Sequence, residues 1–388
     1  MRKYFRGIRD ALLFQTAADA EKGIVFYCEG TAYAPYLRPV IDALHKCYDG
    51  TIYYLTSDDN DQLLIQPPPR VCSYYIGKGD ARTFVLNNLT AKLVVMTMPD
   101  MNTFHIKRSS KAKHYAYLHH SLVSTHMVYR KGAFDCFDSI FCAGQYHIEE
   151  IREWEKLHGF KAKKLVEHGY APLDELIDMA NNENRKSTTN KNAASEDRYD
   201  ILIAPSWGPQ GLMEIHAEEI VGVLLNAGHV VHVRPHPRTR QLSGQVLDEL
   251  ERRFAGHPGF DMNEDTTNYE ALLQANVMIS DWSGVAMEFA FGLEKPVLFI
   301  DVPRKVNNPE YKTLHAVPLE VSYRDQIGKV ISPDRLGELP AALESLKQDS
   351  NTFRSNIRNL REKYFFNIGN SAEQGAKALV DIASNQKI

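Results

Sequence analysis

The stretch at 279–301, ISDWSGVAMEFAFGLEKPVLFID, decides the fold of the second half of this 388-residue chain. A short apolar run leads into a helical segment, and a second apolar run follows Lys295. A strand, a helix and a strand in so few residues predict a βαβ unit of a parallel sheet. Between Trp282 and Leu293 the only charged residue is Glu288, which calls for a reason because an unpaired buried carboxylate is costly.

The same alternation runs through the rest of the chain in two blocks. In the first block, β-rich runs lie at 23–30, 51–57, 91–100, 113–121 and 138–144, and the pattern restarts at 199–208. Strands separated by helices form parallel, doubly wound sheets. The sequence therefore predicts an α/β protein of two Rossmann-like domains, with a ligand cleft near the carboxyl ends of the strands.

The composition of the chain sets the domain boundaries. Residues 181–198 have almost no apolar side chains, which is typical of a polar linker or a disordered loop. We expect a first domain at 1–180, a second domain at 199–348, and C-terminal helices at 349–388 that pack back on the first domain. A length of 388 residues agrees with two domains.

Charge and hydropathy exclude several classes of function. The formal net charge is -4, so no overall field attracts nucleic acid. No run approaches the length of a membrane span. The five cysteines form no CxxC pair, which argues against a disulfide framework or a zinc cluster. We expect a cytoplasmic protein whose cysteines are small core residues.

The N-terminal segment MRKYFRGIRDALLF is basic and amphipathic. A helix packed on its own domain has this pattern, and so does a peripheral contact with the inner face of a membrane. We expect the packed helix and keep the membrane contact as the alternative.

The turn before the helical segment has the features of a phosphate site. Asp281 or Ser283 can cap the helix, and Gly284 leaves room for a ligand. A helix N-terminus with free N–H groups suits a phosphate. Glu288 lies one turn further along the same face, where it could accept hydrogen bonds from a ribose. The alternative is structural: Glu288 pairs with a neighbouring cation or reaches solvent, and Asp281 and Ser283 only cap.

A second candidate stretch, VHVRPHPRTR at 231–240, has its basic residues where a strand ends. Arginine forks bind phosphate oxygens and histidine can donate a hydrogen bond. We expect a proline-stiffened loop in which Arg234, His236 and Arg238 meet the same diphosphate as the helix N-terminus. A basic loop of this kind can also be a solvated surface.

The third stretch, YLHHSLVSTH at 117–126, has a cluster of histidines at a predicted strand end. Imidazole titrates near neutral pH, so His119, His120 and His126, with Ser121, could supply the general base for an acceptor hydroxyl. Only one of two adjacent histidines faces the cleft if the segment is extended. The histidines could instead be structural.

Two weaker candidates remain. The carboxylates of SDDND at 57–61 could bind a divalent cation, although a solvated loop explains them equally simply. The stretch APSWGPQG at 204–211, which includes Pro205 and Ser206, either lines the ligand cleft or forms a turn with no role in binding. We expect no required cofactor.

These stretches resemble the CDP-glycerol glycerophosphotransferase family of teichoic-acid and capsule synthesis. SDWSGVAMEFAFGLEKPVLFIDVPRK is similar to the family's Ser-Asp-x-Ser/Thr-Ser block with its downstream glutamate, Lys-Pro and aspartate. RPHPR resembles the Arg-x-His-Pro block, ILIAPSWG the Ala-Pro-Thr-Trp-Arg block, and HGYAPLDEL the Gly-x-Pro-x-x-Asp turn. The resemblance covers about 115–305.

The resemblance implies a GT-B-like fold, with the acceptor held by the domain at 1–180 and the nucleotide donor by the domain at 199–348. It also implies transfer of a polyol phosphate from a CDP donor to a hydroxyl of a lipid-linked or polymeric glycan, with release of CMP. It implies a first-domain histidine, preferably His120, as the base, and His236 in the second block. The donor would be held by Arg234, Arg238, Pro205, Ser206, Ser280, Asp281, Ser283, Gly284 and Glu288.

The sequence departs from the family's blocks at three positions. Ser121 stands where glycine is usual, Gly284 where a second serine is usual, and Gly208 where arginine is common. The alternatives are therefore a GT-B glycosyltransferase that uses a nucleotide sugar, and a non-catalytic scaffold of a glycan-assembly complex.

Overall fold

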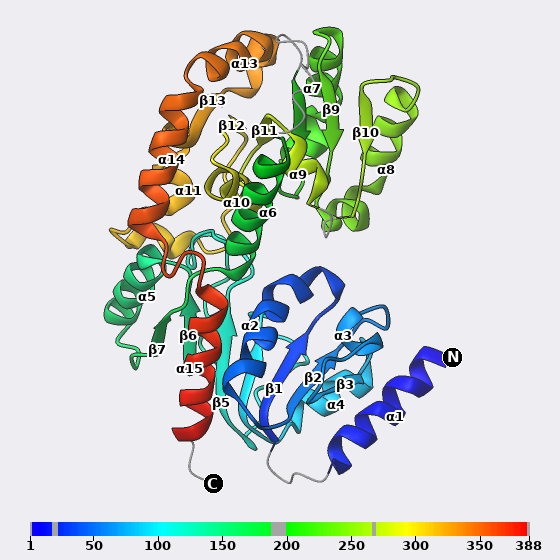
Figure 1. Cartoon of the computed structure of the whole chain (residues 1–388), viewed down its shortest axis with the longest axis vertical. Coiled ribbons are helices and arrows are strands. Elements are labelled where there is room, and N and C mark those ends of the chain that lie inside the picture. Colours follow the sequence, from blue (N-terminus) through cyan, green and yellow to red (C-terminus); the bar gives the residue numbers. More distant parts are fainter. Residues whose placement is uncertain (1, 18–21, 188–198, 266–268, 386–388) are drawn as a thin grey trace.

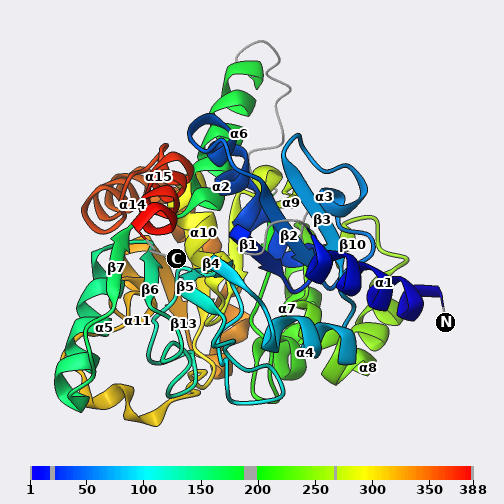
Figure 2. The ribbon, with the colours of Figure 1, turned by 90° about the horizontal axis from the view of Figure 1, so that it is seen from below.

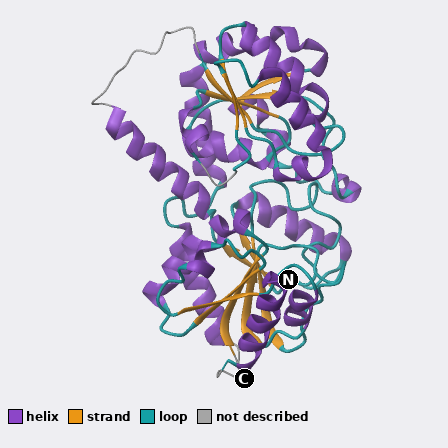
Figure 3. Ribbon diagram, turned by 90° about the vertical axis from the view of Figure 1, so that its right-hand side faces the viewer, coloured by secondary structure: helices purple, strands orange, loops and turns teal. Residues whose placement is uncertain are grey.

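The computed structural model describes residues 2–17, 22–187, 199–265 and 269–385. Two parallel sheets, one from each half of the chain, lie one above the other in Figure 1. Helices flank the strands of each sheet, as Figure 3 shows from the side. The predicted α/β fold of two doubly wound halves is confirmed.

The first sheet has seven strands in the order β3-β2-β1-β4-β5-β6-β7, all paired in parallel. The strands are β1 Lys22–Cys28, β2 Ile52–Thr56, β3 Val71–Tyr75, β4 Ala91–Met96, β5 Ala112–Leu118, β6 Ser139–Cys142 and β7 Lys164–Glu167. Strand β3 was not predicted, because this edge strand has exposed and half-buried positions in its middle and lacks a continuous apolar run.

The second sheet has six parallel strands in the order β10-β9-β8-β11-β12-β13. The strands are β8 Asp200–Ile203, β9 Val230–Val233, β10 Phe260–Met262, β11 Val277–Ser280, β12 Val297–Ile300 and β13 Gly328–Ile331. The stretch at 279–301 forms the end of β11, the next helix and β12. Both strands are buried at every position, as an inner parallel strand requires.

The helices of the first half cover both faces of its sheet. They are α1 Arg2–Thr16, η1 Thr31–Tyr33, α2 Ala34–Cys47, α3 Gln62–Ile65, α4 Asp80–Asn87, α5 Gln145–His158 and α6 Ala171–Ser187. The N-terminal segment is the expected helix packed on its own domain: Ala11 and Phe14 of α1 are buried, and α1 contacts β3 and α4.

The helices of the second half complete the fold. They are α7 Leu212–Asn226, α8 Pro237–Phe254, α9 Glu270–Gln274, α10 Gly284–Leu293, η2 Pro309–Thr313, α11 Leu319–Ser322, α12 Arg324–Ile327, η3 Pro333–Glu338, α13 Leu339–Gln348, α14 Ser350–Tyr364 and α15 Ser371–Asn385. In the part of the chain that the structure describes, no helix is both long and apolar enough to cross a membrane.

The C-terminal helices differ from the expectation that 349–388 packs back on the first domain. Only α15 does so, against α2, whereas α14 contacts α10, α12 and α13 of the second half. Figure 2 shows α14 and α15 along one side of the molecule. The chain crosses between the halves after Tyr364, and Asp174 fixes this crossing by accepting hydrogen bonds from Gly369 N and Ser371 N at 2.7 and 2.8 Å.

Two further expectations need correction. Residues 181–187 of the predicted linker belong to α6, because a polar segment can extend a helix that is anchored by packing at its start; residues 188–198 lie outside the described part. Cys28 and Cys142 are buried, but Cys47 and Cys72 are exposed, so the cysteines are not all core residues.

Candidate active site

His120 follows β5 at the carboxyl edge of the first sheet. Its Nδ1 lies 3.0 Å from Thr97 O, just beyond β4. Tyr117 Oη also lies 3.1 Å from Nδ1, and it donates its own proton toward Tyr129 Oη. Because a carbonyl oxygen only accepts, we assign the proton to Nδ1 and the lone pair to Nε2. Burial lowers the pKa of His120 to about 4, so the ring is neutral at neutral pH. His120 is thus a base with its acceptor nitrogen defined.

His119 was the other candidate base, and its position rules out that role. Its side chain is only 3% exposed. The ring stacks on His147 with centroids 4.1 Å apart and lies edge-on to Tyr117 at 5.0 Å. The strand alternation that places His120 half-exposed at the strand end turns His119 into the core.

The stretch RPHPR ends β9 and starts a helix, whereas the sequence analysis expected a loop. His236 is the N-cap of α8 and Pro237 its first residue, a position that suits proline because no N–H is needed there. His236 Nδ1 accepts the hydrogen bond from Arg238 N at 3.1 Å. Neutral His236 therefore carries its proton on Nε2, as a hydrogen-bond donor.

Two cations lie near His236, on the Trp207 ring beside it. The Trp207 and His236 ring centroids are 6.0 Å apart. Arg238 Cζ lies 4.4 Å and Lys305 Nζ 3.5 Å from the Trp207 ring centroid. Burial, then Lys305 and Arg238, lower the pKa of His236 to about 3. Trp207 and Lys305 were not among the predicted site residues. Trp207 follows β8 and Lys305 follows β12, so only the tertiary structure shows that the two side chains are in contact.

The two halves come together beside His120. The Tyr33 ring of η1 lies edge-on to His120, with centroids 5.5 Å apart. Burial raises the pKa of Tyr33, and the Arg238 guanidinium of the second half opposes that rise. The carboxyl edges of both sheets thus meet with His120 on one side and Arg238 on the other.

Glu288 lies on α10 and faces the first half. Tyr170 Oη donates a hydrogen bond to Glu288 Oε1 at 2.7 Å. Burial raises the pKa of Glu288, while the Tyr170 hydrogen bond and the Arg234 guanidinium oppose that shift. The Glu288 carboxylate therefore interacts with Tyr170 of the first half and with Arg234 of the second. Tyr170 was not among the predicted site residues.

Four predicted donor-binding residues instead build the wall behind the site. Asp281 is 1% exposed; its Oδ1 accepts from Ser206 N at 2.7 Å and its Oδ2 from Ser206 Oγ at 3.0 Å. Ser280 Oγ donates to Ala204 O at 2.8 Å, and Pro205 is buried. These bonds tie the turn after β8 to the end of β11, so these side chains hold the second half together at this edge of its sheet.

The start of α10 also differs from the expected cap. Ser283 is the N-cap residue, but neither its side chain nor that of Asp281 makes a capping hydrogen bond. Gly284 is the first residue of the helix. The first-turn N–H groups of α10 are therefore not taken by a side-chain cap.

The structure gives the carboxylates of SDDND other partners. Thr31 Oγ1 donates to Asp58 Oδ2 at 2.6 Å, and Tyr54 Oη donates to Asp61 Oδ2 at 2.7 Å. Among the described residues, no group of three or more His, Cys, Asp or Glu side chains is placed to hold a metal ion.

A cavity of about 220 Å³ lies beside Arg234 in the second half. It is lined by Leu202, His232, Val233, Arg234, Asp261, Asn263, Asp265, Glu270, Ala271 and Gln274. The second half therefore has open space next to one of the predicted donor-binding arginines.

Two parallel α/β sheets whose carboxyl edges meet define a GT-B-like fold. The model of the CDP-glycerol:poly(glycerophosphate) glycerophosphotransferase family matches residues 61–377, and the chain belongs to this family. It is a transferase that depends on CDP-glycerol.

Solved structures share the fold at low identity. The wall teichoic acid polymerase TagF has a TM-score of 0.63 and 16% identity, over 99% of this chain and 98% of that chain. UDP-GlcNAc 2-epimerase from Neisseria meningitidis has a TM-score of 0.60 and 14% identity, over 92% and 100% of the respective chains. A search of curated proteins gave no match.

Proposed function

We propose that the chain moves glycerol phosphate, or a related polyol phosphate, from its CDP donor to a hydroxyl of a growing teichoic-acid-like surface polymer. The observation that carries the residue roles is the pair of opposite tautomers. His120 presents a lone pair on Nε2, because Nδ1 donates to Thr97 O at 3.0 Å. His236 presents a proton on Nε2, because Nδ1 accepts from Arg238 N at 3.1 Å.

In the proposed step, the acceptor hydroxyl gives its proton to His120 Nε2 and its oxygen attacks the β-phosphorus of the donor. The new P–O bond forms as the bond from that phosphorus to the bridging oxygen breaks, and the bridging oxygen leaves with CMP. His236 Nε2–H, Arg238 and Lys305 stabilise the charge that develops on the leaving phosphate.

We propose that these cations replace a divalent metal. Arg238 and Lys305 flank the Trp207 ring at 4.4 and 3.5 Å, and Arg234 lies within electrostatic range of Glu288. Fixed cations can neutralise a diphosphate as a metal ion does. Turnover of CDP-glycerol is therefore expected to persist in EDTA, and loss of turnover that Mg²⁺ restores would contradict this proposal.

The donor and acceptor sides follow the two halves. The second half offers Arg234, its adjacent cavity and Glu288 for the nucleoside and diphosphate. The first half offers His120 to a hydroxyl of a lipid-linked or polymeric glycan. Such an acceptor is made at a membrane, and we propose that α1 brings the protein to the inner face of that membrane from the cytoplasm.

His120→Ala tests the function. We expect kcat with CDP-glycerol to fall by about 10²–10⁴-fold, the usual contribution of a general base, while CDP-glycerol affinity changes by less than about threefold. His257→Ala is the matched control, since His257 is exposed and lies just before the amino end of β10. Its kcat should equal that of the wild type.

A donor panel separates the alternatives. Turnover only with UDP- or GDP-sugars would overturn the polyol-phosphate assignment in favour of a glycosyltransferase. Full polymer synthesis by both His120→Ala and His236→Ala would overturn the catalytic assignment and leave a scaffold.

A further inference from the structure

Ser121, the residue after His120, lies against the start of α10. A Cβ atom built on Gly284 would lie 2.2 Å from Ser121 Oγ and 3.6 Å from Val123 Cγ1. A distance of 2.2 Å is far inside van der Waals contact, so a side chain at 284 and the Ser121 hydroxyl cannot share this place. The first half therefore puts a hydroxyl where the second half would otherwise have the side chain of its first α10 residue.

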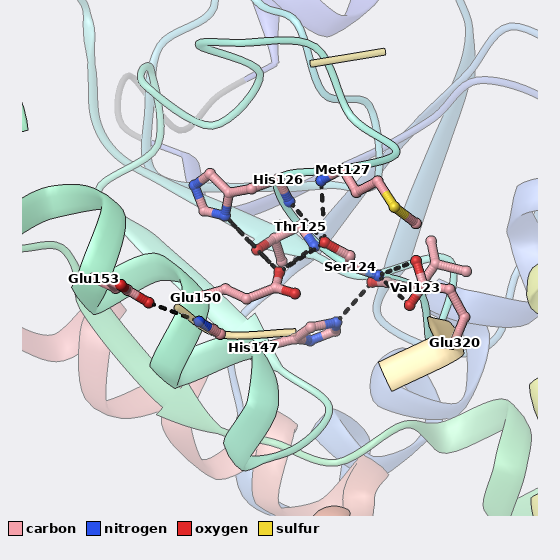
Figure 4. A network of polar contacts seen from close by, with 10 residues as sticks. Val123, Ser124, Thr125, His126, Met127, His147, Glu150, Glu153 and Glu320 are labelled. Carbon is pink, nitrogen blue, oxygen red and sulfur yellow. Dashed lines mark hydrogen bonds and ion pairs between the residues drawn. The ribbon is translucent and has the colours of Figure 1, made fainter. Parts of the chain in front are cut away.

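The loop that carries Ser121 is held firmly on the second half. Ser124 N donates to both carboxyl oxygens of Glu320 in α11 at 3.1 Å, a contact drawn in Figure 4. Further along, Asn307 N donates to Met127 O at 3.0 Å. These bonds cross from one half to the other, so the position of Ser121 at α10 is fixed by several contacts beyond its own.

The hydroxyl is available to a ligand. Ser121 is half-exposed, and among the residues that the structure describes its Oγ has no hydrogen-bond partner. Ser283 beside it is 8% exposed, and its hydroxyl makes no capping bond to the ten-residue helix α10. Two hydroxyls from different halves thus stand at the first turn of a helix whose N–H groups and dipole favour a phosphate.

We propose that Ser121 is a positioning residue for the donor phosphate, supplied from the acceptor half of the molecule. Its hydroxyl donates to a non-bridging oxygen of the phosphate at the α10 N-terminus. Because His120 is the adjacent residue, one loop holds the base for the acceptor and a ligand of the donor, which fixes the distance between nucleophile and phosphorus. This inference rests on the proposed function.

An exchange of side chains between the two positions tests the role of the hydroxyl. Ser121→Gly should lower kcat/KM for CDP-glycerol by about tenfold, the value of one hydrogen bond to a charged group. Gly284→Ser alone should be worse, because its side chain meets Ser121. The double variant Ser121→Gly/Gly284→Ser returns a hydroxyl to the same place and should recover to within about threefold of the wild type.

The matched control is Ser121→Gly/Gly284→Ala, which has the same space and no hydroxyl, and should stay about tenfold below the wild type. Binding of CDP-glycerol by calorimetry and the thermal midpoint are measured for each variant, because a purely structural role would move the midpoint and not the affinity. Equal activity of the two double variants, or wild-type kcat/KM in Ser121→Gly, would overturn the inference alone. Absence of CDP-glycerol binding and turnover in the wild type would overturn the proposed function and this inference with it.

Discussion

Glu288 has two partners in the apolar helix α10, one that indicates a structural role and one that indicates a role in binding the donor. Tyr170 Oη, 2.7 Å away, makes it a link between α10 and the residue just before α6, and the Arg234 guanidinium makes it part of the predicted donor site. A carboxylate with one hydrogen bond keeps further acceptor sites. Glu288 can therefore hold Tyr170 and a ribose hydroxyl together.

Glu288→Gln separates these reasons. The amide oxygen still accepts from Tyr170, but the charge beside Arg234 is lost, so CDP-glycerol affinity should fall by about tenfold with an unchanged thermal midpoint. Tyr170→Phe is the control: it removes the link and should lower the midpoint more than the affinity. If Glu288→Gln instead lowers the thermal midpoint and keeps the affinity for CDP-glycerol, the Glu288 carboxylate has a structural role and does not bind the donor.

The departures from the family's blocks also have local reasons. Gly208 has a φ of 137°, a backbone conformation in which arginine would be strained. Ser121 and Gly284 meet in space, since the hydroxyl of one fills the side-chain position of the other. The backbone conformation thus accounts for Gly208, and the contact between the two halves accounts for Ser121 and Gly284 together.

At the scale of elements, α1 leaves an apolar stripe uncovered. Phe5, Ile8 and Leu12 lie on one face by their spacing, and Phe5 and Leu12 are 65% and 58% exposed. The helix also carries Lys3 and Arg6. Exposed apolar side chains beside cations fit an anionic lipid surface.

This stripe predicts binding to vesicles of phosphatidylglycerol and phosphatidylcholine. Phe5→Ser/Leu12→Ser should weaken co-sedimentation by about a hundredfold, since each apolar side chain contributes roughly 1.5 kcal/mol or more. Leu242→Ser is the control, because Leu242 of α8 is equally exposed, at 58%, in the other half. If Phe5→Ser/Leu12→Ser and Leu242→Ser both co-sediment with the vesicles like the wild type, α1 does not make the membrane contact.

At the scale of the whole molecule, carboxylates join the two halves. Glu320 of α11 accepts from Ser124 N of the first half at 3.1 Å, while Glu150 of α5 holds the same loop within the first half by accepting from Thr125 N at 2.7 Å (Figure 4). Glu153 accepts from His315 N and Ala316 N. The segment after β12 is therefore held on the first half by hydrogen bonds from backbone N–H groups to carboxylate oxygens, with Glu320 as the acceptor in one direction and Glu153 as the acceptor in the other.

Glu320 should make this junction depend on pH. Burial, then the neighbouring Glu150 charge, raise its pKa to about 8. A raised folded-state pKa gives stability that is full below the ordinary value near 4.5 and is lost as pH rises through about 8. Between pH 5 and pH 8 the stability of the wild type should therefore fall relative to Glu320→Gln, by at most about 1.4 kcal/mol per pH unit. Denaturant unfolding of both proteins at several pH values measures this; parallel curves would contradict it.

The sequence by itself determined the alternation of strands and helices, the parallel sheets and the stretches that reach the site. Continuous apolar strands and helix periodicity are local patterns, so 279–301 was interpretable without its neighbours. Edge strands such as β3 have no continuous apolar run, and the start of α8 at Pro237 looked like a loop because proline fits both.

Only the tertiary structure decided which polar residues face a ligand. Ser280 and Asp281 proved to be wall residues because Ala204 and Ser206 take their hydrogen bonds. His119 is buried whereas His120 is half-buried, and the Trp207 ring packs against the Arg238 and Lys305 cations. The physical reason is that burial and hydrogen bonding are settled by residues distant in the chain, whereas secondary structure depends mainly on neighbours along it.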